Sequence, residues 1–198
     1  TSMSTYEDMK ELYEGIPLDR VSSTLIIQPP YSVVTMSQYL LLARERKIPW
    51  ERLIGTIMNC SITQYVGPTL QSNLAWFPFD LSVKIGYDLI EYITPRIPRW
   101  NIININAYNM RETGIDAVQE AAFSMALAAD YIKGLLKRGL DVDSFAHRMA
   151  FFSCAHMDLF EEVAKLRAMR RIWARMLKEK FKAKNKRSMT WRTAIQTA

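Results

Sequence analysis

Five short apolar runs alternate with stretches of helical pattern, and this alternation leaves few folds open to the chain. The five runs cover residues 21–27, 53–58, 102–107, 149–153 and 190–195. The helical stretches cover residues 4–14, 35–47, 81–93, 115–136 and 158–181. Strands that are separated by helices form βαβ units, in which neighbouring strands run parallel. The sequence therefore predicts an α/β fold with a parallel sheet.

The length of the chain limits how much of a barrel it can form. With 198 residues, of which 49% are hydrophobic, the chain can bury the core of one domain. A closed (β/α)8 barrel needs eight strands and typically about 250 residues. About five strands therefore predict parallel βα units that form part of a TIM (β/α)8 barrel, with residues 1–198 as a single partial domain. Three helix starts are predicted from pairs with capping-box spacing, which are Ser4 with Glu7, Thr35 with Gln38, and Asp158 with Glu161.

Hydropathy and cysteine content indicate in which cellular compartment we expect the protein. No apolar run is long enough to span a bilayer, and no charged-then-apolar leader opens the sequence. The two cysteines, Cys60 and Cys154, are too few for a disulfide framework, which indicates a reducing, cytoplasmic location. We expect both to be buried thiols, although each follows a strand-like run, which leaves a position near a site open.

The net charge of +6 is concentrated between Lys165 and Arg187. One interpretation is an anion-binding surface for nucleic acid, an acidic protein or a nucleotide phosphate. The other is the solvated face of an amphipathic helix, because apolar residues recur there at helical spacing, as at Met169, Trp173 and Leu177. We favour the solvated face and expect no nucleic-acid partner.

A polar turn follows the apolar run 102–107 and precedes an Ala-rich helical stretch. It holds an aromatic, an amide, a base and an acid at Tyr108, Asn109, Arg111 and Glu112. Side chains at the carboxyl end of a strand, before the crossover helix, face the ligand site in α/β folds. The residues alone therefore predict a site near Tyr108.

Six segments, in one order along the chain, resemble the methylmalonyl-CoA mutase family of coenzyme B12-dependent acyl-CoA mutases. They are EGIPL at 14–18, LIGTIMN at 53–59, YNMRETG at 108–114, FAHRMAFF at 145–152, EVAKLRA at 162–168 and QT at 196–197. The resemblance covers almost the whole chain and concerns the family's substrate-binding barrel. It implies a radical rearrangement of the carbon skeleton of a CoA thioester, with adenosylcobalamin as cofactor. Such a reaction needs no strong acid, base or nucleophile, which suits a chain with two histidines and no plausible catalytic triad.

The resemblance implies three catalytic residues. Tyr108 matches the active-site Tyr, whose ring lies between cofactor and substrate, although a strand-end Tyr can also cap a core. Asn109 stands where the family has a His that donates to the thioester carbonyl, and an amide can donate the same bond. Gln196 matches a polar group near the reacting centre.

The resemblance also implies a substrate and CoA surface and a wall on the cofactor side. The substrate and CoA residues are Thr24, Thr56, Met58, Gln71, Ser72, Arg148 and Ala150, and the cofactor-side residues are Phe152 and Glu112. Met58 and Ala150 replace a Gln and a Ser of the family, and Arg148 matches an Arg that contacts CoA. For Thr24, Thr56 and Phe152 a role in the core explains the residue equally well.

The largest departure from the family concerns the substrate. Methylmalonyl-CoA mutase has an Arg that pairs with the free carboxylate of its substrate, whereas this chain has Gln71 and Ser72 in that loop. Neutral groups replace a bidentate Arg–carboxylate pair poorly. With Met58 and Asn109, this favours an uncharged or larger acyl group, such as isobutyryl-CoA, 2-hydroxyisobutyryl-CoA or another branched acyl-CoA.

Parts of the family pattern are missing. The cobalamin-binding motif Asp-x-His-x-x-Gly is absent, and His147 and His156 lie in no such motif. We therefore expect adenosylcobalamin to be bound mainly by another domain or subunit, the chain alone to have no mutase activity, and its open sheet edges to favour an oligomer. We expect no metal site, because neither His has partners at ligand spacing. The alternative function is a non-catalytic CoA- or nucleotide-binding or interaction module that uses the basic C-terminal helix.

Overall fold

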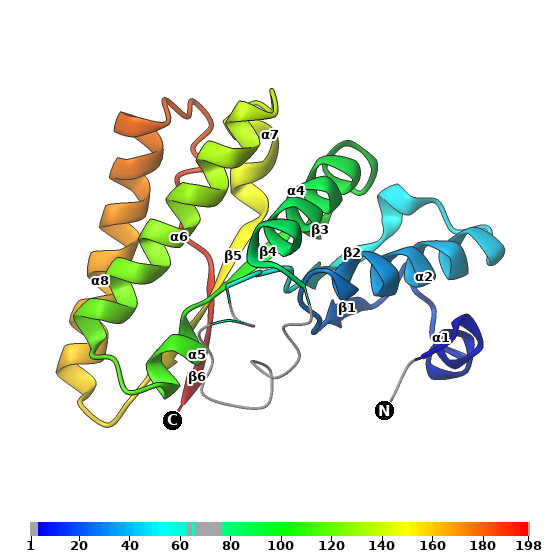
Figure 1. The fold of residues 1–198 in the computed structure, drawn as a ribbon, viewed down its shortest axis with the longest axis horizontal. Helices are drawn as coiled ribbons and strands as arrows, with labels where there is room; N and C mark the ends of the chain where they lie inside the picture. Colours follow the sequence, from blue (N-terminus) through cyan, green and yellow to red (C-terminus); the bar gives the residue numbers. More distant parts are fainter. Residues whose placement is uncertain (1–3, 63–64, 66–76, 198) are drawn as a thin grey trace.

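A computed structural model of the chain describes residues 4–62, 65 and 77–197 (Figure 1). The α-helices in this part are α1 (Tyr6–Leu12), α2 (Tyr31–Glu45), α4 (Phe79–Arg96), α5 (Ala107–Glu112), α6 (Ala117–Lys137), α7 (Val142–Phe145) and α8 (Leu159–Arg175). The strands are β1 (Ser22–Leu25), β2 (Ile54–Ile57), β3 (Trp100–Asn101), β4 (Ile103–Asn106), β5 (Met149–Ala155) and β6 (Thr193–Thr197). The predicted α/β class is confirmed.

All strand pairs in the described residues are parallel, in two sheets of order β1-β2-β3 and β4-β5-β6. The sheets meet where the backbone N–H of Asn104 on β4 donates to the carbonyl of Met58, just after β2, at 2.9 Å. The strands therefore follow one another in chain order across both sheets. This arrangement is consistent with part of a TIM-like barrel.

The predicted strand at 102–107 is divided between the two sheets. Trp100 and Asn101 pair with β2, whereas Ile103–Asn106 pair with β5. Between them, the N–H of Ile102 already donates to the carbonyl of Arg148, which precedes β5. One chain segment thus changes partner at Ile102, and for this reason the described residues form one strand more than the five expected.

The long helices cover the sheets on one side. Figure 1 shows α8, α6, α4 and α2 side by side, and each of these neighbours is in contact. Alternate residues of the strands point toward them: Ile103 and Ile105 are fully buried, as is Trp173, which α8 contributes to the same core. None of the described helices is long and apolar enough to cross a membrane.

Helix starts differ from the predictions in two cases of three. The cap of α1 is Thr5 with Asp8, one residue later than predicted. Helix α2 begins at Tyr31 behind Pro30 without a side-chain cap, so that the pair at Thr35 and Gln38 lies inside the helix. Proline suits this position because its fixed φ is already helical. The third prediction is confirmed, since the Asp158 carboxylate accepts from the N–H of Glu161 at 3.0 Å.

The basic C-terminal segment folds as an amphipathic helix. Met169, Trp173 and Leu177 are buried, whereas Arg167 and Arg170 are exposed. Helix α8 continues into a π-helical turn (Met176–Lys180), close to the predicted end near residue 181. The last strand begins at Thr193, three residues after the predicted start.

Candidate functional site

A cavity of about 710 Å³ opens on the face of the strands that points away from the long helices. Its described wall comes from all six strands or their ends, from the loops that follow β1 and β2, and from the start of α5, which follows β4 directly. Among the site residues predicted from the sequence, the cavity is lined by Thr24, Thr56, Met58, Tyr108, Asn109, Ala150, Phe152 and Gln196. Residues from 24 to 196 thus converge on one space. A volume of this size is typical of pockets for small ligands and cofactors.

Strand pairing explains this convergence. Thr24 and Thr56 are register partners on β1 and β2. Asn104 pairs with Ala150, and Phe152 pairs with Ala194. Side chains alternate across a strand, so paired residues point to the same face. For the two threonines and Phe152, the sequence left open a role in the core. All three line the cavity, so a core role alone does not account for them.

Tyr108 and Asn109 lie in the first turn of α5, a short helix where the sequence predicted a turn. Both are half-buried, and the ring of Tyr108 lies against that of Phe152 on β5, with 5.4 Å between centroids. Aromatic pairs at this separation stabilise one another beyond simple burial. The carboxyl-terminal end of the cavity is therefore an aromatic wall beside an amide.

The opposite end of the cavity carries a polar ladder that sequence reasoning missed. Nη1 of Arg192 donates to Oδ1 of Asn101 at 2.9 Å, and Nδ2 of Asn101 donates to Oγ1 of Thr56 at 2.8 Å. Arg192 also donates to the carbonyl of His147. The ladder crosses from β6 to β2, with Arg192 just before β6. No sequence motif marks this ladder, since the three residues belong to separate segments.

The side-chain oxygens of two asparagines at the cavity lack hydrogen-bond partners among the described residues. Oδ1 of Asn104 and Oδ1 of Asn106 are buried and accept no hydrogen bond from the residues that the structure describes, although both residues line the cavity. An unpaired buried acceptor is costly, and a ligand that donates to it recovers this cost. Gln28 is already engaged: its Oε1 accepts from the N–H of Cys60 at 3.1 Å, and its Nε2 lies 3.9 Å from the Met58 sulfur.

Arg148, for which the resemblance implies a contact with CoA, is not among the residues that line the described cavity. Its guanidinium is buried and donates to the carbonyls of Thr94, Ile97 and Ser144 at 2.8–3.1 Å. Two of these carbonyls belong to the end of α4, where unpaired carbonyls and the helix dipole favour a cation. Burial lowers the pKa of Arg148. In this structure Arg148 therefore holds the end of α4.

Three other predicted residues have different outcomes. Glu112 is exposed at the end of α5, outside the cavity wall, and lies beside Cys154 and His156. Gln71 and Ser72 lie outside the described residues.

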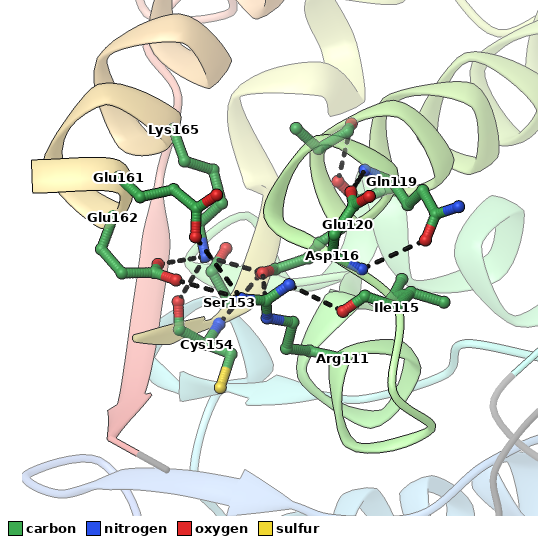
Figure 2. Close-up of polar contacts among 12 residues, drawn as sticks. Arg111, Ile115, Asp116, Gln119, Glu120, Ser153, Cys154, Glu161, Glu162 and Lys165 are labelled. Carbon is green, nitrogen blue, oxygen red and sulfur yellow. Dashed lines mark hydrogen bonds and ion pairs between the residues drawn. The ribbon is translucent and has the colours of Figure 1, made fainter. Parts of the chain in front are cut away.

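A buried charge network holds α5 against its neighbours (Figure 2). Arg111 of α5 lies between Glu120 of α6 and Glu162 of α8, with nitrogen–oxygen distances of 3.9 and 3.6 Å. Lys165 of α8 forms ion pairs with the same two carboxylates. Its Nζ also donates to the carbonyl of Cys154 on β5 at 2.6 Å. The network thus positions the short helix that presents Tyr108 and Asn109.

Cysteine burial is as predicted. Cys60 and Cys154 are both fully buried. Burial raises the pKa of the Cys154 thiol, and the nearby carboxylate of Glu120 raises it further.

The structure is a parallel α/β domain in which strands and strand ends line one cavity. Known proteins with related sequences give the family. Residues 1–198 match the methylmalonyl-CoA mutase family, and the chain belongs to it. Its sequence is 36% identical to methylmalonyl-CoA mutase of Rhizobium meliloti, over 100% of this chain and 27% of the relative. It is 34% identical to the mitochondrial methylmalonyl-CoA mutase of Homo sapiens, over 100% of this chain and 26% of the relative.

A third relative is the methylmalonyl-CoA mutase large subunit of Streptomyces virginiae, with 36% identity over 96% of this chain and 25% of the relative. The chain thus spans about a quarter of the length of the curated relatives that it matches.

Proposed function

We propose that the chain is the substrate-binding part of an adenosylcobalamin-dependent acyl-CoA mutase and forms part of a (β/α)8 barrel. The observation that carries the proposal is the cavity, in which eight residues chosen from the family resemblance meet although they come from five strands or strand ends. Family membership supports an isomerase of this class.

The cavity has the polarity that a CoA thioester requires. At the amino end of β6, Arg192 is exposed and held by Asn101, and a fixed guanidinium suits the phosphates of CoA. At the other end, Asn109 can donate to the thioester carbonyl oxygen, while the apolar surfaces of Tyr108 and Phe152 exclude water from the reacting carbon. In this proposal Arg192 has the CoA-binding role that the sequence assigned to Arg148.

The residues at the carboxyl-terminal rim fit the adenosyl part of the cofactor. The pair of Tyr108 and Phe152 offers an aromatic wall, and the buried, unpaired Oδ1 of Asn106 can accept a bond from a polar hydrogen. When bound, adenosylcobalamin supplies the radical chemistry of the family. The chain's own contribution is to hold the thioester in place and to keep water away.

The substrate we propose is an uncharged, branched acyl-CoA of the isobutyryl or 2-hydroxyisobutyryl type. Met58 and Asn109 both line the cavity, and the part of its described wall that they form offers no cation to pair with a free carboxylate. A carboxylate that loses its water without gaining a partner binds poorly.

Calorimetric titration of the untagged chain with three thioesters tests this proposal without any need for turnover. We expect isobutyryl-CoA and 2-hydroxyisobutyryl-CoA to bind at least about tenfold more tightly than methylmalonyl-CoA, which corresponds to about 1.4 kcal/mol. Preferred binding of methylmalonyl-CoA would refute the altered substrate. Absence of binding by all three would refute the CoA assignment.

Variants locate the binding. Arg192→Gln should weaken the binding of all three thioesters, because Arg192 contacts the CoA part that they share in this proposal. Arg175→Gln, which removes an exposed cation of α8, is the matched control and should change nothing. Equal effects of the two substitutions would refute the role of Arg192.

We further propose that a cobalamin-binding domain or subunit and additional barrel strands complete the site. In the described residues β1 pairs only with β2 and β6 only with β5, which leaves two open edges. Open edges favour association, and we expect an oligomer. A monomer by light scattering would contradict that expectation. Turnover of isobutyryl-CoA with adenosylcobalamin should require the added cobalamin-binding partner.

A specific surface favours the second candidate function, an anion-binding interaction module. Arg167, Arg170 and Arg171 of α8 line a groove of about 750 Å³ together with Trp191. Their charge suits an acidic partner, and binding should then weaken steeply with salt. Salt-dependent capture of nucleic acid or an acidic protein, without affinity for CoA thioesters, would favour this function over the mutase.

A further inference from the structure

Three potential metal ligands of different types meet at the carboxyl-terminal rim, outside the wall of the cavity. The ligand atoms of Glu112, Cys154 and His156 all lie within 4.8 Å of one another. Glu112 ends α5, Cys154 lies in β5, and His156 follows that strand directly. This cluster of a carboxylate, a thiol and an imidazole is called the rim triad below.

Strand geometry explains how the rim triad forms. Side chains two residues apart on a strand point to the same face. Cys154 and His156 therefore continue the row of Ala150 and Phe152, which line the cavity. No metal site was expected from the sequence, because Glu112 is distant along the chain and is brought to Cys154 and His156 only by the packing of α5 on β5.

The backbone of Cys154 is fixed on both sides. Its N–H donates to Oε1 of Glu120 at 3.0 Å, and its carbonyl accepts from Nζ of Lys165 at 2.6 Å. Figure 2 shows the sulfur pointing away from this network. A ligand held in place by surrounding hydrogen bonds loses little freedom when it binds a metal.

The local charge favours a cation although the chain as a whole is basic. The carboxylates of Glu112 and Glu120 lie beside Cys154, and Glu162 shares the cation of Lys165 with Glu120. Arg111, 3.9 Å from Glu120, adds a second cation. An excess of negative charge remains beside a soft sulfur ligand and an exposed imidazole.

We propose that the rim triad binds one divalent transition-metal ion of the zinc type. Sulfur, imidazole and carboxylate are the three ligand types that zinc takes in proteins, and three protein ligands leave a fourth position open. Coordination replaces the thiol proton, which passes to solvent. The site goes beyond the proposed mutase function and does not depend on it, since metal binding is measured without substrate or cobalamin.

Co²⁺ titration of the untagged, metal-free chain tests the proposal, with Zn²⁺ as competitor. We expect saturation at one Co²⁺ per chain, a thiolate-to-cobalt absorption band in the near ultraviolet, and loss of the band when Zn²⁺ is added. Cys154→Ser should abolish the band. His156→Gln and Glu112→Gln should each raise the Kd for Co²⁺ by at least about tenfold, since loss of groups that only support a ligand already costs 10–100-fold.

Matched variants make the result decisive. Cys60→Ser removes the other buried thiol and His147→Gln the other histidine, and both should leave the band and the Kd unchanged. His156 and Glu112 are exposed, so their variants should fold even if Cys154→Ser does not. Absence of saturable Co²⁺ binding, binding without the thiolate band, or an unchanged Kd in His156→Gln would each overturn the proposal. A failure of CoA binding would refute the mutase assignment but leave this result intact.

Discussion

Replacement of Lys165 by Met tests whether the buried charge network holds the site together. The side chain of Lys165 is 2% exposed, and its Nζ contacts two carboxylates, those of Glu120 and Glu162, and the carbonyl of Cys154. Methionine has similar length and flexibility but no charge and no N–H donor. The substitution therefore removes one cation and three contacts while it leaves the volume nearly unchanged.

The expected loss of stability follows from the charges that remain buried after the substitution. Glu120 and Glu162 are 0% and 4% exposed, and after the substitution Arg111 alone would neutralise both, from 3.9 and 3.6 Å. Removal of one partner from a buried ion pair costs about 3–5 kcal/mol, because the other charge stays buried. The carbonyl of Cys154 also loses its donor. We expect the free energy of unfolding to fall by about 4 kcal/mol, a large part of the total for a domain.

Urea denaturation of the full chain, followed by circular dichroism, measures this loss. Arg175→Met breaks the exposed pair of Arg175 with Glu179 and is the control, with an expected change below about 0.5 kcal/mol. The double variant Lys165→Met with Glu120→Gln restores the balance of one carboxylate to one cation, so its loss should be smaller than the sum of the two single losses by about 1–2 kcal/mol. A loss below about 1 kcal/mol for Lys165→Met, or strict additivity, would refute the network.

Three further substitutions test single features of the fold. Gly55→Ala should lower the free energy of unfolding by about 2 kcal/mol or more in urea denaturation, because the new Cβ would lie 2.3 Å from the backbone carbonyl oxygen of Ser23; a neutral result would mean that the two strands are not packed this closely. Arg148→Met should lower the free energy of unfolding by about 3 kcal/mol in the same measurement and leave the affinity for CoA thioesters unchanged, because the guanidinium donates to carbonyls at the end of α4. Loss of CoA affinity in a folded variant would instead support a contact between Arg148 and CoA. Burial is the largest single effect on the pKa of Asp143 and raises it, but donors to the carboxylate, among them the N–H of Lys184 at 2.8 Å and that of Asn185 at 3.2 Å, together outweigh burial, so that the pKa is lowered. The ionised Asp143 carboxylate therefore stabilises the fold above about pH 4, and this stabilisation is lost as the pH falls through the lowered pKa. The difference in free energy of unfolding between the protein and Asp143→Asn, about 1 kcal/mol at pH 7, should shrink toward pH 3. A difference that grows in acid would contradict this sign.

The sequence predicted strands and helix starts correctly where they depend on residues close together in the chain. The apolar runs at β1, β2 and β5 and the cap at Asp158 depend on neighbours within a few residues, and the structure confirms them. The helical turn at Tyr108 and the early start of α2 were missed, because in both cases a helix begins without a side-chain cap. The division of the third strand also has no local signal, since it arises from pairing with β2 on one side and β5 on the other.

The site separates into residues that a family motif marks and residues that only packing reveals. Tyr108, Asn109, Thr56 and Gln196 were chosen from motifs, and strand pairing brings them to one cavity. Arg192 lies in no such motif, and its position depends on hydrogen bonds to segments 45 and 91 residues away.

The proposed exchange of roles between Arg148 and Arg192 depends on the surroundings of each side chain rather than on a motif match. Arg148 stands in the motif segment 145–152, yet its guanidinium is buried and its Nη atoms donate to three carbonyls around the end of α4. A cation with these donors engaged has little left to offer a phosphate, and withdrawing it would leave the carbonyls unpaired. Arg192 is exposed in the cavity and donates through Nη1 to two acceptors among the described residues, so it retains donors for an anionic ligand. The affinity of the two variants, Arg148→Met and Arg192→Gln, for the same CoA thioester therefore decides which arginine meets the CoA, and it does so independently of the identity of the acyl group.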